Sequence, residues 1–268
     1  MRSYFSVGAF FWFFLPVKVF SQLAPVFIPN GGQWHENVLH KMTVENGEVY
    51  MERDGITFAF YDQEFFHHLH AHESPDSVLN VHAIKLVFVG GKVNPSVSVR
   101  QQGTAKYSYY LGKDTSNWAS NLTGARELVY HEIFPKINLR VFATNKGLKY
   151  EFVVMPGGNP RDIKLEVNGA DQVSLVRGDL KISTSTRELI DEAPYSYVGA
   201  KKMEINSSYV LQDHLISFDV DDTYDKNDTL VVDPQLVFST YSGATTNNFG
   251  FTATYDDLGF LYSGSSVF

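Results

Sequence analysis

The chain has 268 residues, of which 44% are hydrophobic and 19% are charged, and this composition excludes a disordered protein. It carries 22 basic and 30 acidic residues, a net charge of −8 that argues against binding to a nucleic-acid backbone. It has no cysteine, which excludes disulfide frameworks, cysteine-ligated zinc, thiol catalysis and a lipid-modified N-terminal cysteine.

The N-terminal segment, residues 1–21, is typical of a secretory signal peptide. Arg2 precedes an apolar run of about a dozen residues, which is the length of a signal-peptide core. Lys18 interrupts this run before it reaches the roughly 20 apolar residues of a membrane-spanning helix, although an uncleaved anchor is the alternative interpretation. We therefore expect cleavage after Ser21, export of the mature chain to the cell surface or the extracellular medium, and no membrane span after cleavage.

From residue 25 onward the dominant hydrophobic period is two, which is typical of half-buried β-strands with one face in water. The clearest alternation occurs in residues 84–88, 137–141, 148–154, 163–167 and 180–182. Turn signals such as Asn46-Gly47 and Asn168-Gly169 separate these runs. Helical periodicity is confined to possible short turns at residues 62–69 and 116–122. The sequence therefore predicts an all-β fold built from antiparallel sandwiches.

A segment rich in proline and glycine, residues 155–160, is the best internal boundary, because both residue types end strands. It separates a predicted N-terminal β-sandwich-like domain, residues 25–156, from a predicted immunoglobulin-like β-sandwich subdomain, residues 157–234. Residues 236–268 change to Ser, Thr, Gly, Asn and aromatic residues and are expected to start an incomplete β-propeller-type repeat. Because one such unit cannot close a ring, we expect a fragment or a truncated product; the alternative is a terminal hairpin packed on the sandwich.

Short motifs follow one another in a fixed order along residues 25–268. They are Phe27-Ile28-Pro29-Asn30-Gly31-Gly32-Gln33-Trp34, the run from His82 to Gly90, Tyr109-Tyr110-Leu111-Gly112-Lys113-Asp114 with Trp118, the run from Val129 to Leu139, the run from Gly147 to Gly157, Glu192-Ala193-Pro194-Tyr195 and Val232-Asp233-Pro234. Together they resemble a β-rich N-terminal domain of large exported Bacteroidota surface proteins. Residues 236–268 are similar to the start of the SBBP-type β-propeller repeat that usually follows it.

That resemblance implies further β-repeats or adhesion-type domains after this region, and a C-terminal sorting domain for type IX secretion in many such proteins. The family domain has no established activity, so the resemblance implies no catalytic residues.

Four of the nine histidines fall within residues 67–72. If this segment is extended, His68, His70 and His72 project from one face with a spacing that suits Zn²⁺ or Cu²⁺; if it is helical, His68 and His72 share a face. The alternative is an exposed polar loop with adventitious metal binding or none. We predict no resident cofactor or metal; His68, His70 and His72 are the candidate ligands for a transition metal.

Other polar clusters do not indicate catalysis. The acidic segment of residues 219–228 has oxygen ligands for Ca²⁺ but lacks the glycine and terminal glutamate of an EF-hand, so a solvated loop is favoured. Adjacent carboxylates at Asp191 and Glu192 are expected to point to opposite faces of a strand. His131-Glu132 lacks the second histidine of a zinc-protease motif. No catalytic residue is predicted, and we do not expect an enzyme.

Five aromatic residues are candidates for a sugar-stacking platform, because aromatic faces suit the apolar faces of sugars. They are Trp34, Tyr107, Tyr109, Tyr110 and Trp118. Packing between strands is the commoner use of such residues.

Two hypotheses follow for function. The first is a non-catalytic cell-surface or secreted β-module that caps or presents a downstream repeat or adhesion region. The alternative is an extracellular carbohydrate-binding or carbohydrate-acting protein. The expected partners are other cell-surface proteins or extracellular glycans, and not nucleic acid.

Overall fold

The structure is a computed structural model that describes residues 25–44, 46–61, 80–145, 147–239, 248–255 and 261–267. Within these ranges the chain forms strands, together with two single 3₁₀ turns, η1 (Thr115–Asn117) and η2 (Pro160–Asp162). The predicted all-β class is therefore confirmed. No helix in the described part of the chain is long and apolar enough to span a bilayer.

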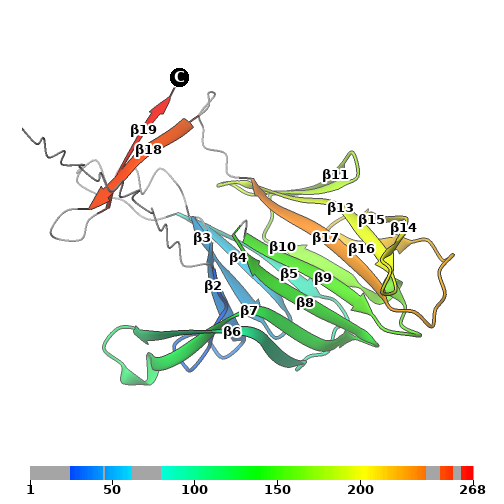
Figure 1. Cartoon of the computed structure of the whole chain (residues 1–268), viewed down its shortest axis with the longest axis horizontal. Helices are drawn as coiled ribbons and strands as arrows, with labels where there is room; N and C mark the ends of the chain where they lie inside the picture. The colour runs from blue at the N-terminus through cyan, green and yellow to red at the C-terminus, as the bar shows by residue number, and fades with distance from the viewer. Residues whose placement is uncertain are drawn as a thin grey trace, which may run out of the picture.

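The first of the two large sheets has eight strands, and all of its neighbours pair in the antiparallel direction. In spatial order these are β1 (Ile28–Pro29), β2 (Val38–Val44), β3 (Gly47–Glu52), β4 (Gly55–Tyr61), β5 (Val81–Phe88), β10 (Lys164–Asn168), β16 (Leu215–Val220) and β15 (Ser207–Gln212). In Figure 1, β2, β3 and β4 of this sheet lie side by side.

The second large sheet is also antiparallel and contains the longest strands of the chain. Its order is β11 (Gln172–Val176), β12 (Asp179–Ser183), β13 (Glu188–Val198), β17 (Leu230–Ser239), β9 (Gly147–Val154), β8 (Ile137–Thr144), β7 (Trp118–Phe134) and β6 (Ser96–Tyr110), and the short β14 (Met203–Ile205) also pairs with β13. A separate antiparallel pair consists of β18 (Asn248–Tyr255) and β19 (Leu261–Val267). In this pair Tyr255 lies opposite Leu261, and the residues that connect them lie outside the described part of the chain.

The hydrophobic core lies between the two large sheets. The ring of Phe152 on β9 contacts that of Phe218 on β16, with centroids 5.9 Å apart, and Phe88 on β5 contacts Tyr130 on β7 at 6.3 Å. All four side chains are buried. Burial of each such ring stabilises the fold by about 2–3 kcal/mol, so contacts of this kind hold the two sheets face to face.

Both sheets continue across the predicted boundary at residues 155–160. On one side of the core Phe88 pairs with Leu165, and on the other Phe152 pairs with Val232. The segment itself is a turn, in which the Gly158 amide donates to the Met155 carbonyl. Proline and glycine end β9 here, as expected. However, strands of residues 25–156 pair with strands of residues 157–234 in both sheets.

Gly55 provides a direct test of how closely β4 and β5 approach. A Cβ at this position would lie 2.4 Å from the backbone oxygen of Leu86. We expect Gly55→Ala to lower the free energy of unfolding by about 2 kcal/mol, because the opposing backbone would have to move. Gly103→Ala is the matched control, since the nearest atom to its Cβ would be 3.8 Å away. Equal urea midpoints for the two variants would contradict this packing.

Candidate functional site

The β6–β7 hairpin projects beyond the sheet to which it belongs. β7 pairs with β8 only from Glu127 to Phe134, and among the strands of this sheet its N-terminal half pairs only with β6. In Figure 1 this hairpin extends away from the other strands at the lower left. Its free half therefore needs support from another part of the chain.

The segment that precedes β1 supplies this support. Phe27 and Ala125 exchange both backbone hydrogen bonds, at 2.8 and 3.0 Å, so the segment lies beside β7 where β8 has ended. Gly124 allows the close approach, because a Cβ there would lie 2.7 Å from Val26 Cγ2. Phe27 itself is fully buried. The N-terminal segment thus anchors the projecting half of the hairpin to the core.

Asn30 organises the loop that continues from this segment. Its side-chain amide donates to three backbone carbonyls, and its side-chain oxygen accepts two backbone N–H groups. The carbonyls are those of Trp34, His35 and Val38 at 3.2, 3.0 and 2.8 Å, and the N–H groups are those of Gly32 and Trp34 at 2.9 and 3.3 Å. The buried side chain of Gln33 adds a bond from its Nε2 to the Pro29 carbonyl at 3.0 Å. These bonds fix the position of Trp34.

Trp34 packs behind the hairpin. Its ring meets that of Tyr109 edge to face, with centroids 5.1 Å apart and planes at 69°. The Lys41 ammonium lies 5.1 Å from the Trp34 centroid and 5.9 Å from that of Tyr109. This cation–π cluster attaches the hairpin to β2.

The end of the hairpin carries an exposed cluster of Tyr110, Leu111 and Trp118, which we call the aromatic tip. Tyr110 and Trp118 are cross-strand partners whose ring centroids are 5.4 Å apart at 82°. Tyr110 is 64% exposed, Leu111 43% and Trp118 42%. The indole Nε1 donates to the Gly112 carbonyl at 3.3 Å, which sets the orientation of the ring.

A compact turn closes the hairpin. Asp114 Oδ1 accepts from the Ser116 amide at 2.9 Å and from the Ser116 hydroxyl at 2.8 Å, and these hydrogen bonds hold the pKa of Asp114 below its usual value. The predicted helical turn at residues 116–122 is wrong: η1 ends at Asn117, and β7 begins at Trp118 because Trp118 pairs with Tyr110. The other predicted helical turn, at residues 62–69, lies outside the described residues.

The five aromatics of the predicted platform do not form one surface. Tyr109 and Tyr110 are neighbours in a strand and so point to opposite faces. Tyr109 faces Trp34, and Tyr110 faces Trp118. The supporting role of Trp34 could not be inferred from spacing, because it depends on the path of the N-terminal segment across β7.

The predicted metal ligands His68, His70 and His72 lie outside the described residues. In the part of the chain that is described, no group of three or more His, Asp or Glu side chains is placed to hold a metal ion.

The acidic segment of residues 219–228 pairs with cations of the same chain. Asp222 contacts Lys226 at 2.8 Å and Arg161 at 3.3 Å. These partners, Lys226 first, hold the pKa of Asp222 below its usual value. Asp225 accepts from the Asn227 amide at 2.9 Å, as a turn aspartate does. The geometry is that of an exposed loop with its own counter-charges.

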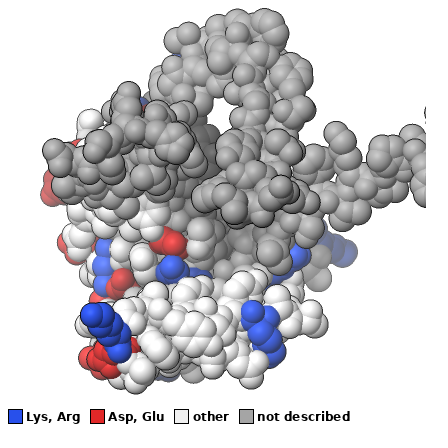
Figure 2. All heavy atoms as spheres, turned by 90° about the vertical axis from the view of Figure 1, so that its left-hand side faces the viewer, with Lys and Arg blue, Asp and Glu red and all other residues white. Residues whose placement is uncertain are grey.

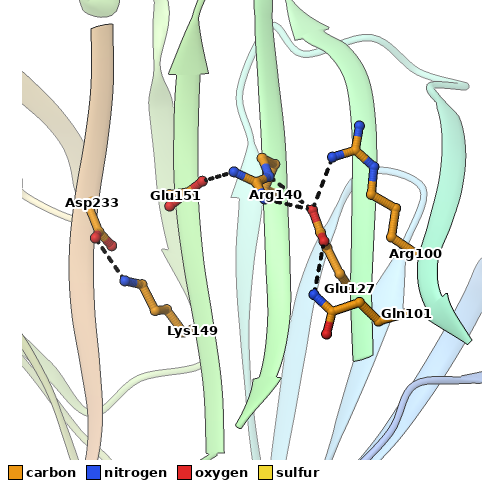
Figure 3. A network of polar contacts seen from close by, with 7 residues as sticks. All are labelled: Arg100, Gln101, Glu127, Arg140, Lys149, Glu151 and Asp233. Carbon is orange, nitrogen blue, oxygen red and sulfur yellow. Dashed lines mark hydrogen bonds and ion pairs between the residues drawn. The ribbon is translucent and has the colours of Figure 1, made fainter. Parts of the chain in front are cut away.

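A second polar feature crosses the outward face of the nine-stranded sheet, and we call it the charged row (Figure 3). Its charged members, from β6 to β17, are Arg100, Glu127, Arg140, Lys149, Glu151 and Asp233. Arg140 is central: its Nε and Nη2 bind Glu127 Oε1 at 3.0 and 2.8 Å, and its Nη1 binds Glu151 Oε1 at 2.6 Å. Lys149 binds Asp233 at 2.8 Å.

The three acids of the charged row are buried although they face away from the core. Only 4% of the Glu127 side chain is exposed, compared with 32% of Arg140 and 56% of Arg100. Burial raises the pKa of Glu151, and the nearby Arg140 charge partly offsets this effect. Burial acts against the charged form of Arg140, but its bonds to Glu127 and the charges of both glutamates raise its pKa on balance. The charged row is therefore a network of ion pairs between neighbouring strands, in which the more exposed basic side chains cover the buried carboxylates.

The described surface also has two open hollows. One, of about 430 Å³, adjoins the charged row and is lined by Gln101, Arg126, Phe142, Ala143, Thr144, Asn145, Lys149 and Glu151. The other, of about 590 Å³, lies between the β10 end and the β15–β16 turn and is lined by residues 166–169 and 212–215. In the second, the His214 ring lies 3.2 Å from the Val167 carbonyl oxygen.

The fold and the supported hairpin define a sandwich-like all-β domain with two open antiparallel sheets. A family model described as "Domain of unknown function (DUF7948)" matches residues 27–235, and the chain belongs to this family. The matched range begins at Phe27, which anchors the hairpin, and ends within β17. Neither a curated protein nor a solved structure matched the chain.

Proposed function

We propose that this chain is an exported, non-catalytic β-module that presents the polypeptide following its sandwich at the cell surface or in the extracellular medium. The signal-like residues 1–21 support export. The position of β17, the strand through which the chain leaves the sandwich, carries the proposal.

β17 lies in the interior of its sheet, between β13 and β9. It pairs with β13 from Leu230 to Ser239 and with β9 from Leu230 to Val232. Leu230 and Val232 are fully buried. Because antiparallel hydrogen bonds run perpendicular to the strands, tension on the following segment loads many of them together. A strand in this position suits a domain that holds an attached region.

The Val232-Asp233-Pro234 motif fits this position. Pro234 has no N–H to donate, and it lies opposite a register shift in β13 between Glu192 and Tyr195. Asp233 is bound by Lys149 of β9. The register shift in β13 therefore accommodates Pro234 within an interior strand. The ion pair between Asp233 and Lys149 attaches β17 to β9 on its other side.

We further propose that the chain is the N-terminal domain of a large Bacteroidota-type surface protein, with residues 236–268 starting an SBBP-type repeat and with sorting by type IX secretion. The collinear motifs and the antiparallel pairing of β18 with β19 support this identity. Other surface proteins or extracellular glycans are the proposed partners.

Export is tested with the full chain carrying a peptide tag after residue 268, expressed in a Bacteroidota host. We expect the mature product to begin at Gln22 and the tagged chain to be recovered outside the cytosol, because residues 1–21 direct export across the inner membrane. A chain that lacks residues 2–21 is the control and should stay inside. Recovery of unprocessed wild-type chain in the cytosol would contradict the proposal.

The role of β17 is tested by pulling the folded full chain from its two ends in an optical trap. We expect the sandwich to unfold in one cooperative step, because an interior strand cannot leave without breaking both neighbouring ladders. Stepwise release of β17 at low force, with the remaining strands still folded, would show that β17 does not hold the attached region.

A further inference from the structure

We propose that the aromatic tip of the β6–β7 hairpin is a glycan-binding site, at which the apolar face of a neutral pyranose stacks on the more exposed ring, that of Tyr110, with the perpendicular ring of Trp118 beside it. The C–H groups on that face complement the negative face of an aromatic ring. This inference goes beyond the presenting role and does not depend on it.

The tip exposes large apolar side chains that the fold leaves uncovered. Tyr110, Leu111 and Trp118 are neighbours at one end of the molecule, and each exposes more than two fifths of its surface. The end view in Figure 2 shows, in its lower part, a largely uncharged surface that has Lys or Arg side chains at both sides and Asp or Glu side chains at the left. A contiguous apolar group of this kind on a projecting element indicates a contact site.

The rings are held before any ligand arrives. The edge-to-face contact positions Tyr110 against Trp118, and the bond to the Gly112 carbonyl orients the indole. Behind them, Trp34 and Lys41 hold the opposite face of the hairpin through Tyr109. Such preorganisation lowers the entropy lost when a ligand orders the side chains that it touches.

The size of the tip favours a sugar over a protein. An aromatic side chain buries at most about 250 Å², so three side chains fall short of the roughly 800 Å² per partner that a stable protein interface needs. A second copy of this chain is therefore a poor occupant. The apolar face of a pyranose is about as large as one aromatic ring, and its hydroxyl groups could bind the polar residues of the closing turn.

Charge also favours a neutral ligand. Lys113 and Asp114 are the charged residues of the closing turn, and their charges cancel. Asp114 is already engaged by both donors of Ser116. The turn therefore offers no net charge for a phosphate, a uronate or a basic peptide.

The experiment measures retardation of the full chain in native gels that contain mannan, dextran, galactan or xylan. We expect at least one of these neutral polysaccharides to retard the wild-type chain. Trp118→Ala and Tyr110→Ala should each weaken this retardation at least tenfold. Tyr195→Ala is the matched control, because Tyr195 is exposed on the same sheet and contacts another ring, that of Tyr197, at 5.8 Å.

Folding of each variant is checked by its urea midpoint, and the more exposed Tyr110 keeps the test valid if Trp118→Ala does not fold. Retardation that is lost in both tip variants and kept in Tyr195→Ala supports the site. No retardation by any of the four polysaccharides, or equal retardation of wild type and tip variants, overturns it. Neither result bears on the export of the chain.

Discussion

Asp191→Asn is expected to make the protein more stable than wild type at pH 8, while the two proteins have similar stabilities near pH 4. Asp191 lies on β13 and faces the core, where only 3% of it is exposed. The Tyr150 hydroxyl donates to its Oδ2, and its Oδ1 is buried without a hydrogen bond of good geometry. A charged carboxylate in this place is poorly compensated.

Burial raises the pKa of Asp191 from 3.8 to about 7. The Tyr150 and Tyr209 hydroxyls act in the opposite direction, and the nearby charges of Asp233 and Glu192 add to the rise. Because Tyr209 belongs to β15 of the other sheet, the protonation of Asp191 affects a contact between the sheets.

The sign of the pH effect follows from proton counting. Between pH 4 and pH 7 the folded chain keeps a proton on Asp191 that the unfolded chain has lost, so stability falls as the pH rises through this window. Above pH 7 both states are ionised, and this group contributes no further change. A shift of about three pKa units corresponds to a loss of about 4 kcal/mol.

The measurement is the urea unfolding free energy of wild type and Asp191→Asn from pH 4 to pH 8.5. Glu192→Gln is the control, since its side chain is exposed on the other face of the same strand. We expect the Asp191→Asn curve to lack the fall that wild type and Glu192→Gln share. Three parallel curves would show that Asp191 is ionised in the fold throughout.

Local pattern was sufficient to predict the strands but not their partners. The alternation of residues 137–141 and 148–154 predicts one buried and one outward face, and Leu139 and Tyr150 are buried as this requires. By contrast, β5 pairs with β10 across 75 residues of sequence. Nothing within either strand specifies that choice, because it depends on how the whole set of apolar faces is buried together.

The same limit applies to the polar groups. The opposite orientations of Asp191 and Glu192 follow from strand geometry and were predicted. The burial of Glu127 and Glu151 was not predicted, because hydrophobic alternation places both residues on the solvent-facing side of their strands. Long basic side chains from neighbouring strands cover both glutamates. This covering depends on which residues the pairing of the strands places opposite each other. Trp34 likewise acquires its role only when residues 27–34 cross β7.

Strand pairing places Arg140 between Glu127 and Glu151, so the charged row is sensitive to the loss of this central arginine. We expect Arg140→Met to lower the free energy of unfolding by about 3 kcal/mol at pH 7. Methionine retains much of the apolar stem but leaves Glu127 and Glu151 buried without the guanidinium that binds both. This cost is mainly that of two uncompensated charges, and not the net value of the ion pairs.

Arg100→Met is the matched control for Arg140→Met. Arg100 reaches the same Glu127 carboxylate, but at 3.5 Å and with 56% of its side chain exposed. Because Arg100 is largely exposed to solvent and its contact is long, we expect this pair to contribute less than about 1 kcal/mol. Urea unfolding of the two variants at pH 7 should therefore separate them clearly, and equal losses would contradict the central role of Arg140.

A change of pH then distinguishes unpaired charge from lost packing. Without the Arg140 charge the pKa of Glu151, already raised by burial, should rise further, so the folded variant takes up a proton as the pH falls below 7 and regains stability relative to wild type. Adding Glu127→Gln and Glu151→Gln to Arg140→Met removes the charges and should restore most of the stability at pH 7. If the deficit of Arg140→Met is the same at pH 5 and pH 7 and the triple variant recovers nothing, the arginine acts through its packing alone.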